Sequence, residues 1–94
     1  GDNRRRANAF YRARRFGHMV YAYVMIVTGA GKSGELLTRI GDVPAVHEAH
    51  VVAGQFDIIA EVEADAVYDI LESVASTIGG FPGVDETRTY VALE

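Results

Sequence analysis

Apolar residues follow a strand-like pattern in four stretches of the chain and a helical pattern in two others. The first strand-like stretch, VYAYVMIVT, is almost continuously apolar, β-branched and aromatic, and it ends at Gly29. Such a run is typical of a central strand followed by a turn. A tight link at Gly54 and Gln55 separates the second stretch from the third. The predicted strands are residues 20–28, 45–53, 56–64 and 83–94.

Two helices are predicted between these strands, which gives the order βαββαβ. In residues 32–41 apolar side chains recur at helical spacing before Gly41, which stands where a C-terminal cap is expected. In residues 65–79 the apolar positions are spaced i, i+3, i+4, i+7 and i+11, and Asp65 stands at the expected N-cap. These apolar positions are Val67, Ile70, Leu71, Val74 and Ile78.

The chain also contains an internal repeat. Shifted by 38 residues, IGDVPAVHEAH (residues 40–50) coincides with IGGFPGVDETR (residues 78–88) at five of eleven positions. In both copies a glycine ends the helix, a proline blocks its continuation and a valine begins the next strand. Two βαβ units of similar build predict an α+β, ferredoxin-like fold, with two helices on one face of a four-stranded antiparallel sheet.

The other face of this sheet is predicted to be apolar as well. The side chains expected there are Tyr21, Tyr23, Met25, Val27 and Ile59. A sheet face this apolar is expected to be buried against another protein surface. We therefore expect a homodimer in which two sheets face each other, as in a dimeric α+β barrel.

Composition narrows the class of protein further. A chain of 94 residues with 49% hydrophobic and 23% charged residues fits one globular domain. It has no cysteine, which excludes disulfides and thiolate chemistry. No apolar run reaches the roughly 18 residues that span a bilayer, and nothing resembles a signal peptide. We therefore expect a cytoplasmic protein with no membrane contact.

The net charge of −4 conceals two oppositely charged parts. Residues 1–18 contain six arginines and one acid, whereas residues 19–94 contain three basic residues and twelve acids. Phosphate contacts need Lys and Arg, so the acidic part is poorly suited to nucleic acids. Residues 1–18 form a basic extension with three open interpretations. It is an arm that contacts nucleic acid, a short helix on a partner subunit, or sequence added by cloning or upstream of a native start at Met19.

Residues 46–57, VHEAHVVAGQFD, resemble the core of the Lrp/AsnC effector-binding domain, also called the RAM domain. That family shows the pattern V-x-x-[AC]-x-x-V-[TA]-G-x-[YF]-D, followed by an apolar strand. The resemblance covers residues 19–94 and fits a stand-alone form of the domain. Eighteen arginine-rich residues cannot make the helix-turn-helix of about fifty residues that full regulators carry. Ala53 also replaces the threonine of many members.

The resemblance implies a sensor without enzymatic activity, cofactor or catalytic residue. It would bind a small effector, for which an amino acid is the leading candidate, and act in transcriptional or metabolic regulation. Its expected partners are a second copy in a homodimer, further copies in a higher oligomer such as a tetramer of dimers, and a relative that contains a helix-turn-helix. Direct DNA binding is not expected.

The resemblance also implies a ligand site in the link between the second and third strands. Backbone N–H groups around Gly54 could receive a ligand carboxylate, and the Asp57 carboxylate could pair with an ammonium group. On the residues alone, the same link is also explained as a hairpin turn in which Gly54 has a positive φ and Asp57 hydrogen-bonds the turn. The predicted ligand-binding residues are His50, Val52, Ala53, Gly54, Gln55, Phe56 and Asp57.

Two alternatives to a sensor remain. A small enzyme of the dimeric α+β barrel type would need a polar catalytic residue in its cavity, where the predicted sheet face offers only the phenols of Tyr21 and Tyr23. An assembly scaffold would need no ligand. No metal site is expected, because His47 and His50 lie three residues apart in a strand and should point to opposite faces.

Overall fold

The computed structural model describes residues 19–93, so the predicted basic extension, residues 1–18, lies outside the described part of the chain. The predicted boundary between this extension and a domain at 19–94 therefore stays a prediction. The elements of the described part are β1 (Val20–Thr28), α2 (Ser33–Gly41), β2 (Val46–Val51), β3 (Ile58–Ala64), η1 (Asp69–Val74), α3 (Ala75–Gly79) and β4 (Val84–Val91).

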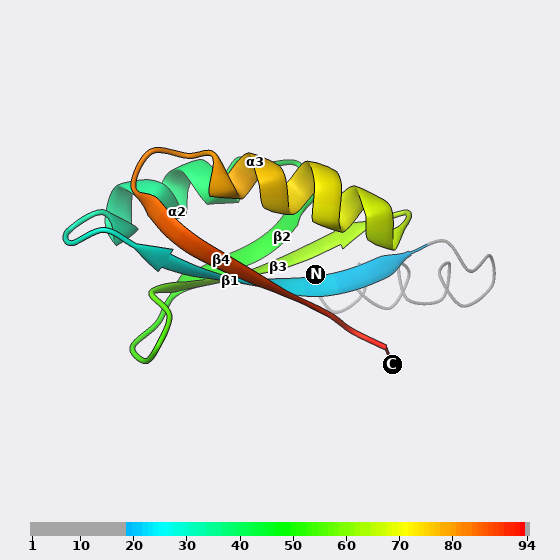
Figure 1. The fold of residues 1–94 in the computed structure, drawn as a ribbon, viewed down its shortest axis with the longest axis horizontal. Coiled ribbons are helices and arrows are strands. Elements are labelled where there is room, and N and C mark those ends of the chain that lie inside the picture. The colour runs from blue at the N-terminus through cyan, green and yellow to red at the C-terminus, as the bar shows by residue number, and fades with distance from the viewer. Residues whose placement is uncertain (1–18, 94) are drawn as a thin grey trace, which may run out of the picture.

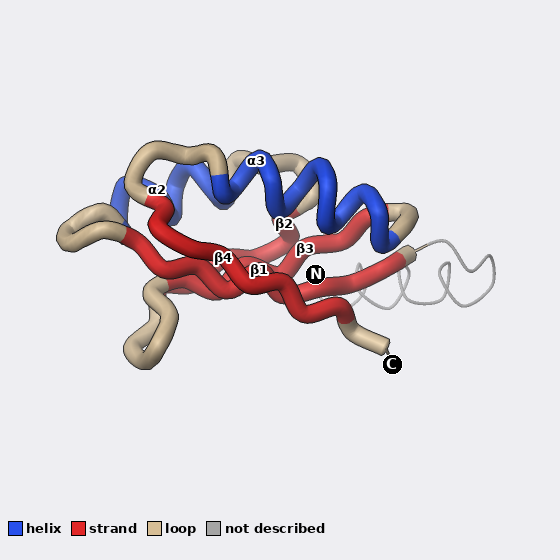
Figure 2. The backbone as a smooth tube through the Cα atoms, viewed as in Figure 1, coloured by secondary structure: helices blue, strands red, loops and turns tan. Residues whose placement is uncertain are grey.

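The four strands form one antiparallel sheet in the order β2-β3-β1-β4. The helices lie together on one side of it (Figures 1 and 2). This arrangement confirms the predicted ferredoxin-like α+β fold. The most apolar strand, β1, lies inside the sheet and pairs with β3 on one side and β4 on the other.

The core lies between the sheet and the helices. Alternate residues of β1 and β3 point into it, and each of these two strands contributes three buried side chains. The helices contribute the rest, with α2 supplying Leu36 and Ile40. The buried core residues are Ala22, Val24, Ile26, Leu36, Ile40, Ile58, Ala60, Val62, Ile70, Val74 and Ile78.

The internal repeat is also a repeat of backbone geometry. After α2, Val43 N–H donates to the Ile40 carbonyl at 3.1 Å and Val46 N–H to the Val43 carbonyl at 2.9 Å. After α3, Phe81 N–H donates to Ile78 at 3.1 Å and Val84 N–H to Phe81 at 3.1 Å. The same turn thus converts each helix into the strand that follows it.

The second helical segment differs from its prediction. Its middle, η1, is π-helical, and the buried residues Ile70, Val74 and Ile78 are four apart. A π turn bonds i to i+5 and holds more residues than an α turn, so residues three apart no longer share a face. Val67 and Leu71, predicted to be buried, are therefore 44% and 48% exposed.

The link between the second and third strands is longer than predicted. β2 ends at Val51 and β3 begins at Ile58, so residues 52–57 form a loop instead of a tight turn at two residues. Asp57 closes this loop from both sides: the Val52 N–H donates to the Asp57 carbonyl at 2.8 Å, and the Asp57 N–H donates to the Ile26 carbonyl of β1 at 2.8 Å. The loop thus begins and ends at a bonded pair, Val52 and Asp57, with four residues between them.

Replacing Gly83 with alanine should destabilise the domain by about 1–2 kcal/mol. Gly83 has a φ of +99°, and a Cβ there would stand 3.2 Å from Leu36 Cδ1 and 3.4 Å from Lys32 Cβ. Gly34→Ala is the matched control, because Gly34 lies in α2 with open space around a new Cβ. That variant should gain up to about 1 kcal/mol. Urea unfolding measures both, and midpoints that move in the same direction would contradict this explanation of Gly83.

Candidate functional site

No described element covers the sheet face opposite the helices, which we call the open face (Figure 1). Tyr23 lies at its centre, opposite Tyr90 of β4 and Glu61 of β3. Tyr23 is 43% exposed and Tyr90 is 53% exposed. The next pair along β1 places Met25 opposite Ile59. The middle of the open face therefore exposes apolar and aromatic surface, as the sequence predicted.

Charged side chains border this apolar centre on both sides. On β4, Arg88 Nε donates to Glu86 Oε2 at 3.1 Å, and both residues are exposed. On the β3 side Glu61 and Glu63 alternate with the buried positions of the strand. An apolar centre with a polar rim is the composition of a protein–protein interface.

Tyr21 has an unusual position at one end of this face. Its hydroxyl oxygen is buried and makes no hydrogen bond within the described part of the chain. Burial raises the pKa of the Tyr21 phenol, and the charge of Glu63, which lies opposite on β3, raises it further. The folded Tyr21 phenol therefore keeps its proton to a higher pH than an exposed phenol does.

The loop of residues 52–57 projects from the sheet on the side away from the helices (Figures 1 and 2). Asp57 fixes its base: the Thr28 N–H donates to Asp57 Oδ2 at 2.8 Å, and the Val52 N–H donates to the Asp57 carbonyl at 2.8 Å. Ala53, Gly54 and Gln55 at the tip are exposed. The loop thus has a fixed base and an exposed tip.

The structure brings six of the seven predicted ligand-binding residues together in this loop, namely Val52, Ala53, Gly54, Gln55, Phe56 and Asp57. Gly54 has the positive φ that the hairpin interpretation predicts, at 159°, near the edge of extended backbone. Asp57 uses one carboxylate oxygen to hold the loop on β1. Sequence reasoning assigned that carboxylate either to a ligand or to the turn itself, and did not foresee its bond to β1.

The seventh predicted residue, His50, lies on the open face and not in the loop. It stands opposite Ile59, and its Nε2 is 3.9 Å from Glu48 Oε2. Glu48 is in turn opposite Glu61, and ligand atoms of these three residues lie within 4.8 Å of one another. The sequence signal for this cluster was the spacing Glu-x-His, which places both side chains on one face of a strand.

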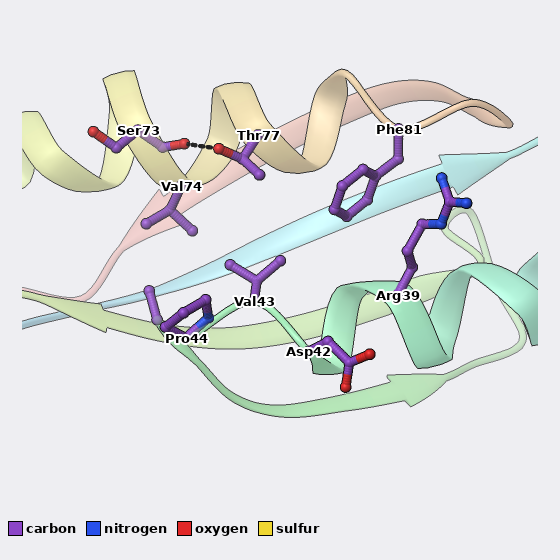
Figure 3. A pocket seen from close by; sticks show the side chains of 9 residues that line it. Arg39, Asp42, Val43, Pro44, Ser73, Val74, Thr77 and Phe81 are labelled. Carbon is purple, nitrogen blue, oxygen red and sulfur yellow. Dashed lines mark hydrogen bonds between the residues drawn. The ribbon is translucent and has the colours of Figure 1, made fainter.

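A groove of about 460 Å³ opens between the two helices, on the side of the domain away from the open face (Figure 3). The Arg39 guanidinium stands 5.8 Å from the centre of the Phe81 ring at one end of it. Thr77 Oγ1 donates to the Ser73 carbonyl at 2.6 Å on its η1–α3 wall. Sequence reasoning did not identify this groove. Its lining residues are Arg39, Asp42, Val43, Pro44, Ala45, Ser73, Val74, Thr77 and Phe81.

Among residues 19–93, no helix is both long and apolar enough to cross a membrane.

The family profile described as "Lrp/AsnC ligand binding domain" matches residues 21–94. Among curated proteins, the HTH-type transcriptional regulator FL11 of Pyrococcus horikoshii is 24% identical over 78 residues, which are 83% of this chain and 51% of that protein. The leucine-responsive regulatory protein of Escherichia coli K12 is 30% identical over 57 residues, 61% of this chain and 35% of that protein. The chain thus spans about half the length, or less, of these regulators.

Solved structures share the fold of this chain. TTHA0845 from Thermus thermophilus superposes with a TM-score of 0.74 at 28% identity, over 80% of this chain and 94% of that one. The hypothetical protein PHS023 from Pyrococcus horikoshii superposes with a TM-score of 0.72 at 35% identity, over 80% of this chain and 90% of that one. E. coli AsnC, at 16% identity and a TM-score of 0.70, shares the fold over 86% of this chain and 55% of its own.

The buried Tyr21 hydroxyl gives a testable prediction. Tyr21→Phe should leave stability at pH 7 unchanged or raise it by up to about 1 kcal/mol, because it removes an unpaired buried polar atom. Above about pH 10 the unfolded phenol ionises while the folded one keeps its proton, so the wild type loses stability as pH rises. The Tyr21→Phe variant should lose less stability over the same pH range.

Chemical unfolding between pH 8 and pH 11 measures this difference. Tyr68→Phe is the control, because Tyr68 is 70% exposed. Identical alkaline profiles for the two variants would show that Tyr21 is not the group responsible.

Proposed function

This chain belongs to the Lrp/AsnC family of ligand-binding domains, and from that premise we propose that it is a dimeric sensor of a small effector, in which the loop of residues 52–57 takes part in binding. The family is established by the match of its profile to residues 21–94, and the relatives include transcriptional regulators. The effector, the assembly and the roles of single residues are our proposal. An amino acid is the ligand class that we favour.

The main support for this proposal is that the loop lies beside an apolar sheet face that no element of residues 19–93 covers. Tyr23, Met25 and Tyr90 expose apolar surface on that face, and the loop extends beyond it on the same side. A second subunit placed against the open face would therefore also meet the loop. A ligand bound at the seam would then contact two chains, which couples binding to assembly.

The loop has the chemical groups that an amino acid needs. Its exposed tip at residues 53–55 presents backbone N–H groups to a carboxylate. Asp57 Oδ2 is held by the Thr28 N–H, and the second carboxylate oxygen can accept a hydrogen bond from an ammonium group. The half-buried side chains of Val52 and Phe56 provide apolar surface for the ligand side chain. His50 contributes from the neighbouring strand if the seam extends along the open face.

Two observations weigh against the alternatives. An enzyme of the dimeric α+β barrel type would place its reactive groups on the open face, where Tyr21 carries a phenol with a raised pKa, the opposite of an activated base. A scaffold without a ligand would not require a loop with a fixed base and an exposed tip. The regulatory homologues also point to a protein that is not an enzyme.

The dimer is tested by light scattering on Tyr23→Lys. The wild type should be a dimer or a multiple of a dimer at micromolar concentration. Tyr23 is opposite Glu61, so lysine there is compatible with the folded subunit, but it would bury an ammonium group between two sheets. We expect dissociation to be favoured at least tenfold. Tyr68→Lys, on the helix side, is the matched control and should leave the assembly unchanged. A stable wild-type monomer would refute the dimer.

The effector is tested first by a thermal-shift screen with each proteinogenic amino acid, at low and at high salt. Calorimetry on the strongest ligand then compares Asp57→Ala, Asp57→Asn and the exposed control Asp42→Ala. If Asp57 pairs with an ammonium group, both Asp57 variants should bind at least tenfold more weakly, since asparagine keeps an oxygen for Thr28 but loses the charge. If only Asp57→Ala weakens binding, Asp57 acts by positioning the loop. Unchanged affinity in both variants would contradict a role for Asp57.

A further inference from the structure

The open face also contains a cluster of metal-ligating side chains, of which the proposed effector site uses only His50. Glu48 and His50 on β2 and Glu61 on β3 each offer one ligand atom, and these atoms lie within 4.8 Å of one another. We propose that the cluster binds a divalent transition-metal ion of the Zn²⁺ class, with His50 Nε2 and one oxygen from each glutamate as ligands.

A bulge in β2 creates the cluster. Val46 pairs with Val62 and Glu48 pairs with Glu61, so two steps along β2 correspond to one step along β3. The extra residue, His47, moves each later side chain of β2 to the opposite face of the sheet. Without it His47 would stand opposite Glu61, and Glu48 would face the core. With it, Glu48 and His50 follow each other on the open face.

The sequence argument against a metal considered only His47 and His50. It is correct that residues three apart cannot share a face in a regular strand. The structure, however, combines His50 with a carboxylate two residues away and with a second carboxylate from the neighbouring strand. Imidazole nitrogen and carboxylate oxygen are both zinc ligands.

Distances and charge both fit an ion of this size. Zinc holds nitrogen and oxygen ligands at about 2.0–2.2 Å, so ligand atoms around one ion lie about 3–3.5 Å apart. His50 Nε2 and Glu48 Oε2 are 3.9 Å apart, and their side chains are 64% and 38% exposed, which leaves room for rotation. Glu48 and Glu61 are directly opposite each other. Two carboxylates supply the negative charge that a divalent cation attracts.

Calorimetric titration of the full chain with ZnCl₂ at pH 7.5 in a non-chelating buffer tests the site. We expect one saturable site per subunit with a Kd in the micromolar range. His50→Gln and Glu61→Gln should each weaken binding at least tenfold. Glu63→Gln is the matched carboxylate control, because Glu63 lies on the same face of β3 but opposite Tyr21, and its Kd should stay within twofold.

The chain has three histidines, so His18→Gln and His47→Gln complete the controls. Loss of binding in either of these, or wild-type affinity in His50→Gln, would overturn the proposal, as would the absence of saturable binding. NMR of the histidine rings in the wild-type chain keeps the test valid if a variant fails to fold. Zinc should shift the Nε2 resonance of His50 and leave that of His47 unchanged, and the reverse pattern would refute the assignment.

Discussion

The structure depends on one constraint: β1 is apolar on both faces and lies inside the sheet. Its buried residues Ala22, Val24 and Ile26 pack under the helices, while Tyr21, Tyr23 and Met25 alternate with them on the open face. Within residues 19–93 the helices cover one face only. Exposed aromatic surface at the centre of a sheet is costly in water, so the second face is where the domain must meet something else.

The loop, the cluster and the open face lie on one side of the sheet because strand alternation and two local irregularities place them there. The bulge at His47 brings Glu48 and His50 to the open face. The bond from Thr28 to Asp57 fixes the base of the loop at the end of β1. The helix side has a different character: its groove is lined by residues of the two helices and the turns that follow them, and it shares no residue with the loop.

The sequence was sufficient for the topology, the core strands and the repeated helix-to-strand turn, because all three depend on regular periods and on Gly and Pro. Sequence reasoning was wrong where an irregularity shifts the periodicity of an element. The π-helical η1 exposes Val67 and Leu71, which a period of 3.6 assigned to the core. The loop residues were identified through a family pattern, whereas the structural role of Asp57 depends on a contact with Thr28, 29 positions away in sequence. Such a contact has no local signal.

The most direct test of the central claim, that a second copy covers the open face, is an isotope-filtered NMR experiment on a mixture of labelled and unlabelled chains. The chain has two methionines, and Met25 lies near the centre of the open face. With one chain labelled at its methionine methyl groups, we predict intermolecular NOEs from Met25 to tyrosine rings of the open face in the unlabelled chain. Intermolecular NOEs that involve Tyr68 on the helix side and not Met25 would contradict the account.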